Sequence, residues 1–199
     1  MMHGVANNFA AIAALIQMKA ASVDDATAKS VLDDVIEQVR VMARVHQRLR
    51  ADDQDVSVDS KAFIQELCGD LKASMARGRP ISIECKADSR PLPVNDALSI
   101  GLIINELVTN ATKHAFPGHR VGRIRVGFNV SNDHSYLTVE DDGIGFGEQR
   151  ETGMGDDLVR ALSQQLGGQL RVHSTKSGST FRLSMPHLTA ATQRPDTAS

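Results

Sequence analysis

The stretch NELVTNATKHA, at residues 105–115, decides how this 199-residue chain is interpreted. On a helix, Glu106 and Asn110 are four residues apart and share one face, which Lys113 continues. A carboxylate, an amide and an ammonium group are costly to bury without partners. Together they suit a magnesium-bound triphosphate, because the oxygens serve the metal and the ammonium neutralises phosphate. An ordinary amphipathic helix with a polar face is the alternative that this stretch leaves open.

A second informative stretch, VEDDGIGF, runs from residue 139 to residue 146. Its apolar strand ends in acidic residues, and Asp141 begins an Asp-x-Gly-x-Gly pattern with Gly143 and Gly145. An aspartate at the end of a strand can accept a hydrogen bond from an exocyclic amine, and the glycines let the backbone approach a planar ring. Asp-Gly turns are also common in hairpins, so this pattern alone is weak.

A third stretch, TGMG at residues 152–155, precedes a helix that the sequence predicts from Asp157. Gly153 and Gly155 would leave amide N–H groups pointing outward at the start of that helix, where a phosphate could bind. A Rossmann-type site is excluded, because no parallel βαβ unit surrounds the pattern and its third glycine is missing.

The order of the predicted elements favours an α+β fold, in which helices cover a sheet of mostly hairpin-linked strands. Helices are expected at residues 60–77, 95–115 and 157–166, and strands at residues 80–86, 123–130, 136–139, 169–173 and 180–185. Before them, apolar stripes through Ile12 and Ile16, and then through Leu32 and Val39, predict an antiparallel helical hairpin.

The pattern divides the chain into three segments. Residues 1–55 would form the helical hairpin, residues 56–188 an α/β sandwich domain, and residues 189–199 a disordered tail. A single pair of helices buries its stripes poorly. We therefore expect a homodimer, in which two hairpins close a four-helix bundle.

Composition excludes several classes of function. Lys and Arg total 22 against 24 Asp and Glu, and this net charge of −2 argues against a nucleic-acid binder. The two cysteines, Cys68 and Cys85, show neither metal-ligand spacing nor a disulfide framework. No apolar run approaches the ~20 residues that span a bilayer, and no signal peptide is recognisable. We therefore expect a cytoplasmic protein with no membrane segment within this chain.

In their order and spacing, the three stretches resemble the nucleotide-binding boxes of the GHKL superfamily. That superfamily includes the gyrase B subunit, the MutL mismatch-repair protein and the sensor histidine kinases. Residues 105–117 are similar to one histidine kinase subclass, whose phosphoacceptor helix reads H-R-V-K-N-N-L. The corresponding segment here is HGVANNF at residues 3–9. The resemblance extends from His3 to about Pro186.

This resemblance implies a protein-histidine kinase of a two-component system, with ATP and Mg²⁺ as its cofactors. His3 would be phosphorylated from Mg-ATP and would pass the phosphoryl group to an aspartate of a response-regulator receiver domain. Asn110 would ligate Mg²⁺, and Lys113 and His114 would contact the phosphates. Glu106 matches the acidic residue that activates water in the hydrolysing members; in a kinase it would orient or support the metal shell.

The resemblance also implies how the nucleotide pocket is built. Asp141 would bind the adenine amine, and Thr180 belongs to the same nucleotide-binding set. Four glycines would shape the pocket and its short lid at residues 147–152: Gly143, Gly145, Gly153 and Gly155.

Two departures from the family pattern leave other functions open. Gly4 and Ala6 stand where the subclass has Arg and Lys next to the histidine. Asp156 and Asp157 follow the third stretch, where the family usually has Leu, and they would repel a triphosphate docked there. A phosphotransfer or phosphatase module with weak or no autokinase activity is therefore the second interpretation. A third is an ATPase of this superfamily that hydrolyses ATP through Glu106.

Overall fold

The computed structural model describes residues 12–18, 20, 23, 25, 28–29, 32, 35–36, 39, 43, 57–75, 80–146 and 154–186. The chain divides into two compact units, Met1–Gln54 and Asp55–Ser199. Helices and a sheet are both present, which confirms the expected α+β class. The predicted tail at residues 189–199 lies outside the described residues.

In the first unit, the described residues of both predicted helices are helical, at positions 12–18 and 20, and at positions 28–29, 32, 35–36, 39 and 43. Asp25 caps the second helix, because its Oδ1 accepts a hydrogen bond of 2.7 Å from the Ala28 N–H. A small apolar core joins the two helices, made of buried Ala13, Ala20 and Ile36 with Ile16, Leu32 and Val39 packed against them. Ile12 of the predicted stripe remains 44% exposed.

The second unit is built on a five-stranded sheet with the strand order β2-β4-β5-β7-β6. The strands are β2 (Ile81–Ala87), β4 (Gly122–Val130), β5 (His134–Asp141), β6 (Gln169–Thr175) and β7 (Gly178–Pro186). β2 and β4 are parallel, and the other neighbours are antiparallel. A separate ribbon pairs β1 (Ser57–Asp59) with β3 (Pro91–Pro93). The sequence did not predict this ribbon, because three-residue strands are too short to show alternation.

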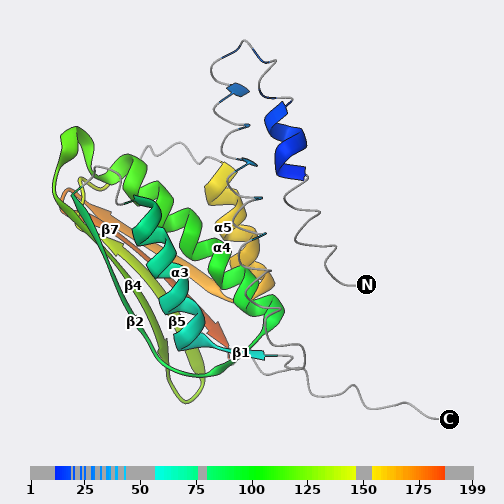
Figure 1. The fold of residues 1–199 in the computed structure, drawn as a ribbon. Coiled ribbons are helices and arrows are strands. Elements are labelled where there is room, and N and C mark those ends of the chain that lie inside the picture. Colours follow the sequence, from blue (N-terminus) through cyan, green and yellow to red (C-terminus); the bar gives the residue numbers. More distant parts are fainter. Residues whose placement is uncertain are drawn as a thin grey trace. The chain divides into compact units, whose positions relative to one another are not determined.

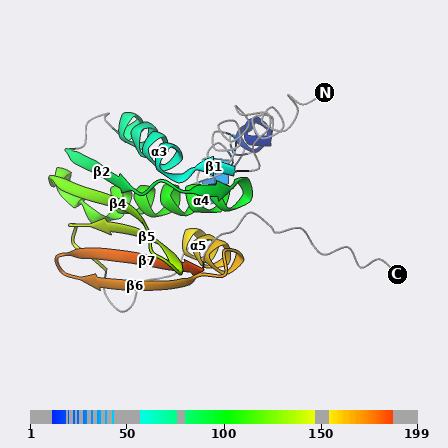
Figure 2. The same ribbon diagram turned by 90° about the horizontal axis from the view of Figure 1, so that it is seen from below.

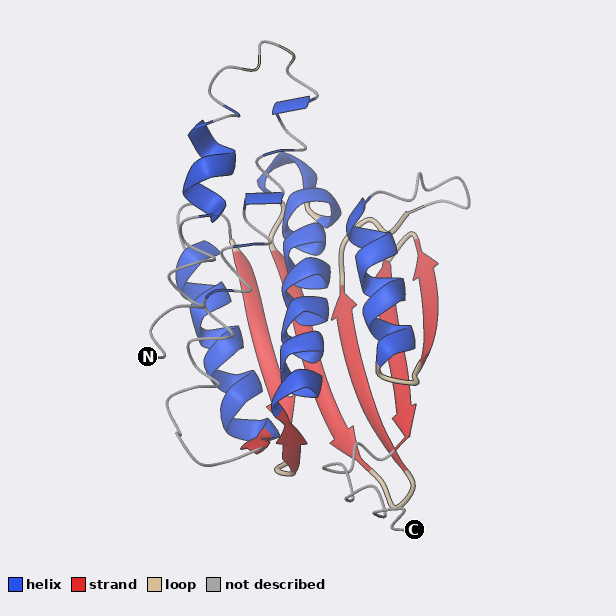
Figure 3. Ribbon diagram, turned by 90° about the vertical axis from the view of Figure 1, so that its right-hand side faces the viewer, coloured by secondary structure: helices blue, strands red, loops and turns tan. Residues whose placement is uncertain are grey.

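Three helices, α3 (Ser60–Met75), α4 (Val94–Asn110) and α5 (Met154–Gln165), cover one face of this sheet (Figure 1). Figure 2 gives the view from below, in which the strands of the five-stranded sheet follow one another in the order β2-β4-β5-β7-β6. In Figure 3, α4 runs between α3 and α5 and packs against both. Eleven residues of α4 are buried, because this helix has neighbours on three sides.

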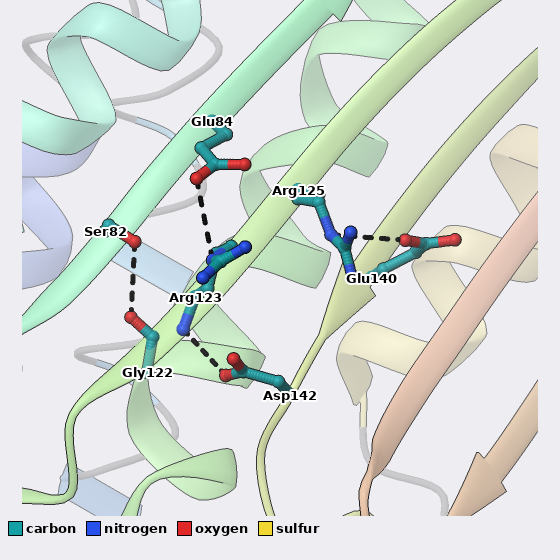
Figure 4. Close-up of polar contacts among 7 residues, drawn as sticks. All are labelled: Ser82, Glu84, Gly122, Arg123, Arg125, Glu140 and Asp142. Atoms are coloured by element: carbon teal, nitrogen blue, oxygen red, sulfur yellow. Dashed lines mark hydrogen bonds and ion pairs between the residues drawn. The ribbon is translucent and has the colours of Figure 1, made fainter.

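Alternating burial along the strands explains why only one face is covered. On β4, Ile124, Val126 and Phe128 are buried beneath the helices. Arg123 and Arg125 alternate with these residues and lie on the opposite face. There they form ion pairs of 3.5 Å with Glu84 and Glu140, respectively (Figure 4). These half-exposed pairs contribute at most about 1 kcal/mol each, so the buried face supplies the larger part of the stability.

The helix predicted at residues 95–115 is present, and its last part changes form. α4 ends at Asn110, and Ala111–Ala115 continues it as a π-helical turn. A short 3₁₀ turn, Pro117–His119, leads into β4. Such π-helical turns are rare and often occur at functional sites.

Candidate functional site

The first turn of α5 lies directly against α4 at the position of Gly155. A Cβ atom placed on Gly155 would lie 2.8 Å from Glu106 Oε2 and 3.5 Å from Asn110 Nδ2. At 2.8 Å a Cβ atom would be too close to this oxygen, so the Glu106 carboxylate would have to move if residue 155 were not glycine. The structure thereby brings together the first and third sequence stretches, which are about 40 residues apart.

The helix α5 begins earlier than the sequence predicted, at Met154 instead of Asp157. Gly155 is therefore part of the first helical turn, together with Asp156 and Asp157. The start of a helix carries a partial positive charge. Glu106 is only 9% exposed, and its carboxylate contacts this turn. The positive electrostatic potential of the helix start therefore favours the negative charge of the carboxylate.

The Asp141 stretch lies against the far end of the helix that carries Glu106 and Asn110. The Ile144 N–H donates a hydrogen bond of 3.0 Å to the carbonyl oxygen of Ala115. A Cβ on Gly143 would lie 2.5 Å from both the Cβ and the carbonyl oxygen of Ala115. The Gly143 N–H in turn donates a hydrogen bond of 2.9 Å to Asp141 Oδ1, which orients this carboxylate.

Asp141 and Asp142 are adjacent in sequence and have different surroundings. Asp142 Oδ1 accepts a hydrogen bond of 2.7 Å from the Arg123 N–H (Figure 4), and its carbonyl oxygen accepts one of 2.9 Å from Arg120 Nη2. These contacts tie Asp142 to the start of β4. Asp141 follows the buried Val139 by two positions on β5 and so shares the helix-covered face. Asp142 therefore has a structural role, whereas the carboxylate of Asp141 faces the candidate site.

Gly145 holds the loop after Asp141 against the turn between β6 and β7. Its φ is +63°, and a Cβ there would lie 1.8 Å from the carbonyl oxygen of Thr175. The next N–H, that of Phe146, donates a hydrogen bond of 2.8 Å to Ser174 Oγ. Ser174 Oγ also lies 3.3 Å from Ser179 Oγ, so this edge of the site carries two linked hydroxyl groups.

Ser179 is a further candidate site residue, which the sequence analysis did not name. It stands directly opposite Asp141 in the β5–β7 pairing and is 4% exposed. Thr180 stands opposite Glu140, on the other face of the sheet. The structure therefore does not bring Thr180 together with Asp141. Only the pairing register distinguishes the two neighbouring hydroxyl residues, and one sequence does not reveal that register.

Lys113 and His114 lie on the π-helical turn that follows Asn110, and both side chains are exposed. Thr112, in the same turn, donates a hydrogen bond of 2.8 Å from Oγ1 to the Val108 carbonyl oxygen. Both candidate phosphate contacts thus remain at the end of the helix where the sequence placed them. His3, Gly153 and the predicted lid at residues 147–152 lie outside the described residues.

Within the described residues, no group of three or more His, Cys, Asp or Glu side chains could hold a metal ion. Mg²⁺ at a triphosphate keeps water and phosphate ligands and needs only one or two ligands from the protein. Asn110 and Glu106 supply hard oxygens of that kind, so the residues present fit such an ion.

Two family models match this chain. One, described as "Histidine kinase", matches residues 1–75, and the other, described as "Histidine kinase-, DNA gyrase B-, and HSP90-like ATPase", matches residues 95–189. The chain therefore belongs to the sensor histidine kinases of the GHKL superfamily. The described residues contain no helix long and apolar enough to cross a membrane.

Individual relatives agree with this family. The "Blue-light-activated histidine kinase 2" of Erythrobacter litoralis is 28% identical over 193 residues, which cover 92% of this chain and 55% of the relative. The "Sensor histidine kinase PdtaS" of Mycobacterium tuberculosis is 29% identical over 188 residues, covering 89% of this chain and 36% of the relative. The chain thus spans about half or less of these curated relatives.

Solved structures show the same fold. The histidine kinase domain of the Erythrobacter litoralis EL346 blue-light activated histidine kinase superposes with a TM-score of 0.67 at 26% identity. That match covers 89% of this chain and 86% of the solved domain. The Acinetobacter baumannii histidine kinase AdeS shares the fold at 15% identity, with a TM-score of 0.56.

Proposed function

We propose that this chain is the kinase core of a two-component system, which phosphorylates its own His3 from Mg-ATP and then transfers the phosphoryl group to a response-regulator aspartate. The approach of Gly155 to Glu106 and Asn110 carries this proposal. It gathers a carboxylate, an amide and a helix start at one place, as a magnesium-bound triphosphate requires.

Adenine would be recognised at the other end of the same site. Asp141 would accept a hydrogen bond from the exocyclic amine of the base, since Gly143 orients its carboxylate from one side. Ser179 would assist from the neighbouring strand, because the strand register places it beside Asp141. In this proposal Ser179, instead of the expected Thr180, therefore supplies the hydroxyl group that contacts the nucleotide.

The phosphates would lie toward the π-helical turn and the start of α5. Asn110 would ligate Mg²⁺ through its amide oxygen, and Glu106 would orient the metal shell. Lys113 and His114 would neutralise phosphate charge from their exposed positions. Gly153 and Gly155 would shape the phosphate end of the pocket, and bound Mg²⁺ would offset the charge that develops on the transferred group.

His3 would be the phosphoacceptor, in a variant of the H-R-V-K-N-N-L motif that reads HGVANNF. A neutral imidazole nitrogen is a competent nucleophile near neutral pH, because the unperturbed pKa of histidine is about 6.5. As the nitrogen bonds to the γ-phosphorus, the bond from that phosphorus to the bridging oxygen breaks and ADP leaves. The resulting phosphoramidate is labile enough to pass its phosphoryl group to a carboxylate.

We further propose that residues 1–55 form the dimerising hairpin, residues 56–188 the nucleotide-binding domain and residues 189–199 a tail. The division between the compact units at Gln54 and Asp55 supports this organisation. Three apolar side chains on the first helix, Ile12, Leu15 and Met18, are 44%, 61% and 73% exposed. A second copy of the hairpin would bury them in a four-helix bundle, so we propose a homodimer as the functional form. The proposed location is the cytoplasm.

Incubation with ATP labelled with ³²P at the γ-position tests this function. We expect a label on the protein that is lost in acid, is stable in alkali and is absent from the His3→Gln variant. A label that persists in this variant would refute the assignment of His3.

One observation favours the alternative of a phosphotransfer or phosphatase module. Asp156 and Asp157 occupy the first turn of α5, next to the Gly155 contact with Glu106. Two carboxylates there oppose a triphosphate. If Mg-ADP produces no heat on titration and the chain accelerates dephosphorylation of a receiver domain, this second function replaces the first.

A further inference from the structure

The only two cysteines of the chain lie side by side, although 17 positions separate them in the sequence. Cys68 is on α3 and is 4% exposed, and Cys85 is on β2 and is partly exposed. α3 packs directly on β2, the parallel edge strand of the sheet, and the side chains of the two cysteines interact across this packing.

Neither cysteine is in a disulfide, and the two side chains interact through a hydrogen bond in which Cys68 is the donor. This hydrogen bond lowers the pKa of Cys85, although burial acts in the opposite direction. The same hydrogen bond, together with burial, raises the pKa of Cys68. Cys85 is therefore the more acidic and the more accessible of the two.

We propose that Cys68 and Cys85 form a reversible disulfide between α3 and β2, with Cys85 as the thiol that reacts first with peroxide. Two thiols that share a hydrogen bond, on elements packed against each other, need little movement to reach the separation of a disulfide bond. A thiolate in a partly exposed place is the reactive form of cysteine, whereas a fully buried thiol is inert until a partner sulfur becomes electrophilic.

The chemistry balances with hydrogen peroxide as the oxidant. The Cys85 thiolate attacks one peroxide oxygen, the O–O bond breaks, and the departing hydroxide is protonated to water. This step leaves Cys85 as a sulfenic acid. The Cys68 thiol then attacks the Cys85 sulfur. The S–S bond forms, the S–O bond breaks, and the hydroxyl group leaves with the Cys68 proton as a second water.

Mass spectrometry of the full-length chain tests the proposal without any nucleotide, so its outcome is independent of the kinase function. The reduced protein is treated with hydrogen peroxide, quenched with catalase and alkylated under denaturing conditions. We expect a monomer about 2 Da lighter than the reduced chain that carries no alkyl groups, with the two cysteine peptides linked. Treatment with dithiothreitol should restore two alkylatable thiols.

Single-cysteine variants test the order of the two steps. With Cys68→Ala, no second thiol is available, so Cys85 should stop at the sulfenic acid and react with dimedone. With Cys85→Ala, Cys68 should stay reduced at the same peroxide concentration. Melting curves of both variants verify that they fold. The detection of linked cysteine peptides in the wild-type chain does not depend on these variants.

Three results would overturn the proposal. The wild-type chain could keep both thiols alkylatable after peroxide, or it could form only dimers linked between two copies of Cys85. The third contradicting result is that Cys68, in the folded Cys85→Ala variant, oxidises as fast as Cys85 does in the Cys68→Ala variant.

Discussion

Ser179 stands directly opposite Asp141 across β5 and β7, and its side chain is 4% exposed. Thr180, its neighbour, lies on the other face of the sheet, opposite Glu140. These two adjacent hydroxyl residues therefore form a matched pair, of which one faces the candidate site and the other faces away.

We predict that Ser179→Ala weakens binding of Mg-ADP roughly 5- to 10-fold, because the loss of one hydrogen bond typically costs about 1 kcal/mol. Thr180→Ala should leave the dissociation constant within about twofold. Isothermal titration calorimetry measures both. A larger loss for Thr180→Ala than for Ser179→Ala would show that the nucleotide does not use the helix-covered face.

Gly155 offers a test of the contact between α5 and α4. In Gly155→Ala, the new Cβ would lie 2.8 Å from Glu106 Oε2, so the carboxylate must move. Because this oxygen is at the flexible end of a side chain, we expect the melting temperature to change by less than roughly 3 °C. The rate of phosphoryl transfer should fall at least about tenfold, since small displacements of a positioning group are costly in catalysis.

Gly69→Ala is the control for that substitution. Gly69 lies inside α3, and a Cβ there would meet nothing within 4 Å. The change should stabilise the fold by about 0.5–1 kcal/mol, because alanine is the better helix former, and leave transfer unchanged. An equal loss of transfer in both variants would mean that the Gly155 contact has no special role.

Gly145 and Gly118 share a φ of +63° and differ in their surroundings. A Cβ on Gly145 would lie 1.8 Å from the Thr175 carbonyl oxygen, whereas a Cβ on Gly118 would meet nothing within 4 Å. Gly118→Ala should therefore cost only the backbone strain, about 1–2 kcal/mol. Gly145→Ala should cost about 3 kcal/mol or more, since the loop must also move away from β6. Urea unfolding curves compare them, and equal costs would contradict the described packing of this loop.

Asp59 predicts a pH dependence of stability at the start of α3. Its Oδ1 accepts a hydrogen bond of 2.8 Å from the Ala62 N–H, and its Oδ2 accepts one from Ser89 Oγ. The hydrogen bond from Ser89, then that from Ala62, holds the pKa of Asp59 below its ordinary value. The stabilising contribution is therefore complete above the unfolded pKa of about 3.9 and is lost as the pH falls through the lower folded pKa.

Two substitutions distinguish the helix-capping hydrogen bond of Asp59 from the effect of its negative charge. Asp59→Ala should lower the free energy of unfolding at pH 7 by about 1 kcal/mol, as expected for a lost helix cap. Asp59→Asn should retain most of the cap and lose the dependence on acid. Denaturation curves from about pH 2 to pH 7 span the loss of this contribution and measure both effects. An unchanged acid dependence in Asp59→Asn would assign it to other carboxylates.

The fold could be predicted from the sequence where long patterns repeat. The apolar run before Asn110 and the alternation along residues 123–130 both predicted their elements, because deep burial imposes periodicity over many residues. The ribbon between β1 and β3 could not be predicted, since its three-residue strands are held by pairing with distant residues. The first turn of α5 likewise lies against a distant residue, because Gly155 approaches Glu106 there.

The sequence predicted which types of residue form the candidate site. It did not predict the pairing register of the strands that brings some of them together. Glu106 and Asn110 share a helix face by spacing alone, and Gly155 meets them in the structure. The choice between Ser179 and Thr180 depends on which residue pairs with Asp141, and that pairing arises only when β5 and β7 are aligned. The contact between the two thiols depends in the same way on how α3 packs over β2.

A crystal structure of this chain with Mg²⁺ and a non-hydrolysable ATP analogue tests the central claim most directly, namely that Asn110 and Asp141 bind one nucleotide. We predict that Asp141 lies within hydrogen-bonding distance of the adenine amine and that the Asn110 amide oxygen is a ligand of the magnesium ion. A nucleotide bound without contact to either residue, or bound on the sheet face that carries Arg123 and Arg125, would contradict the account.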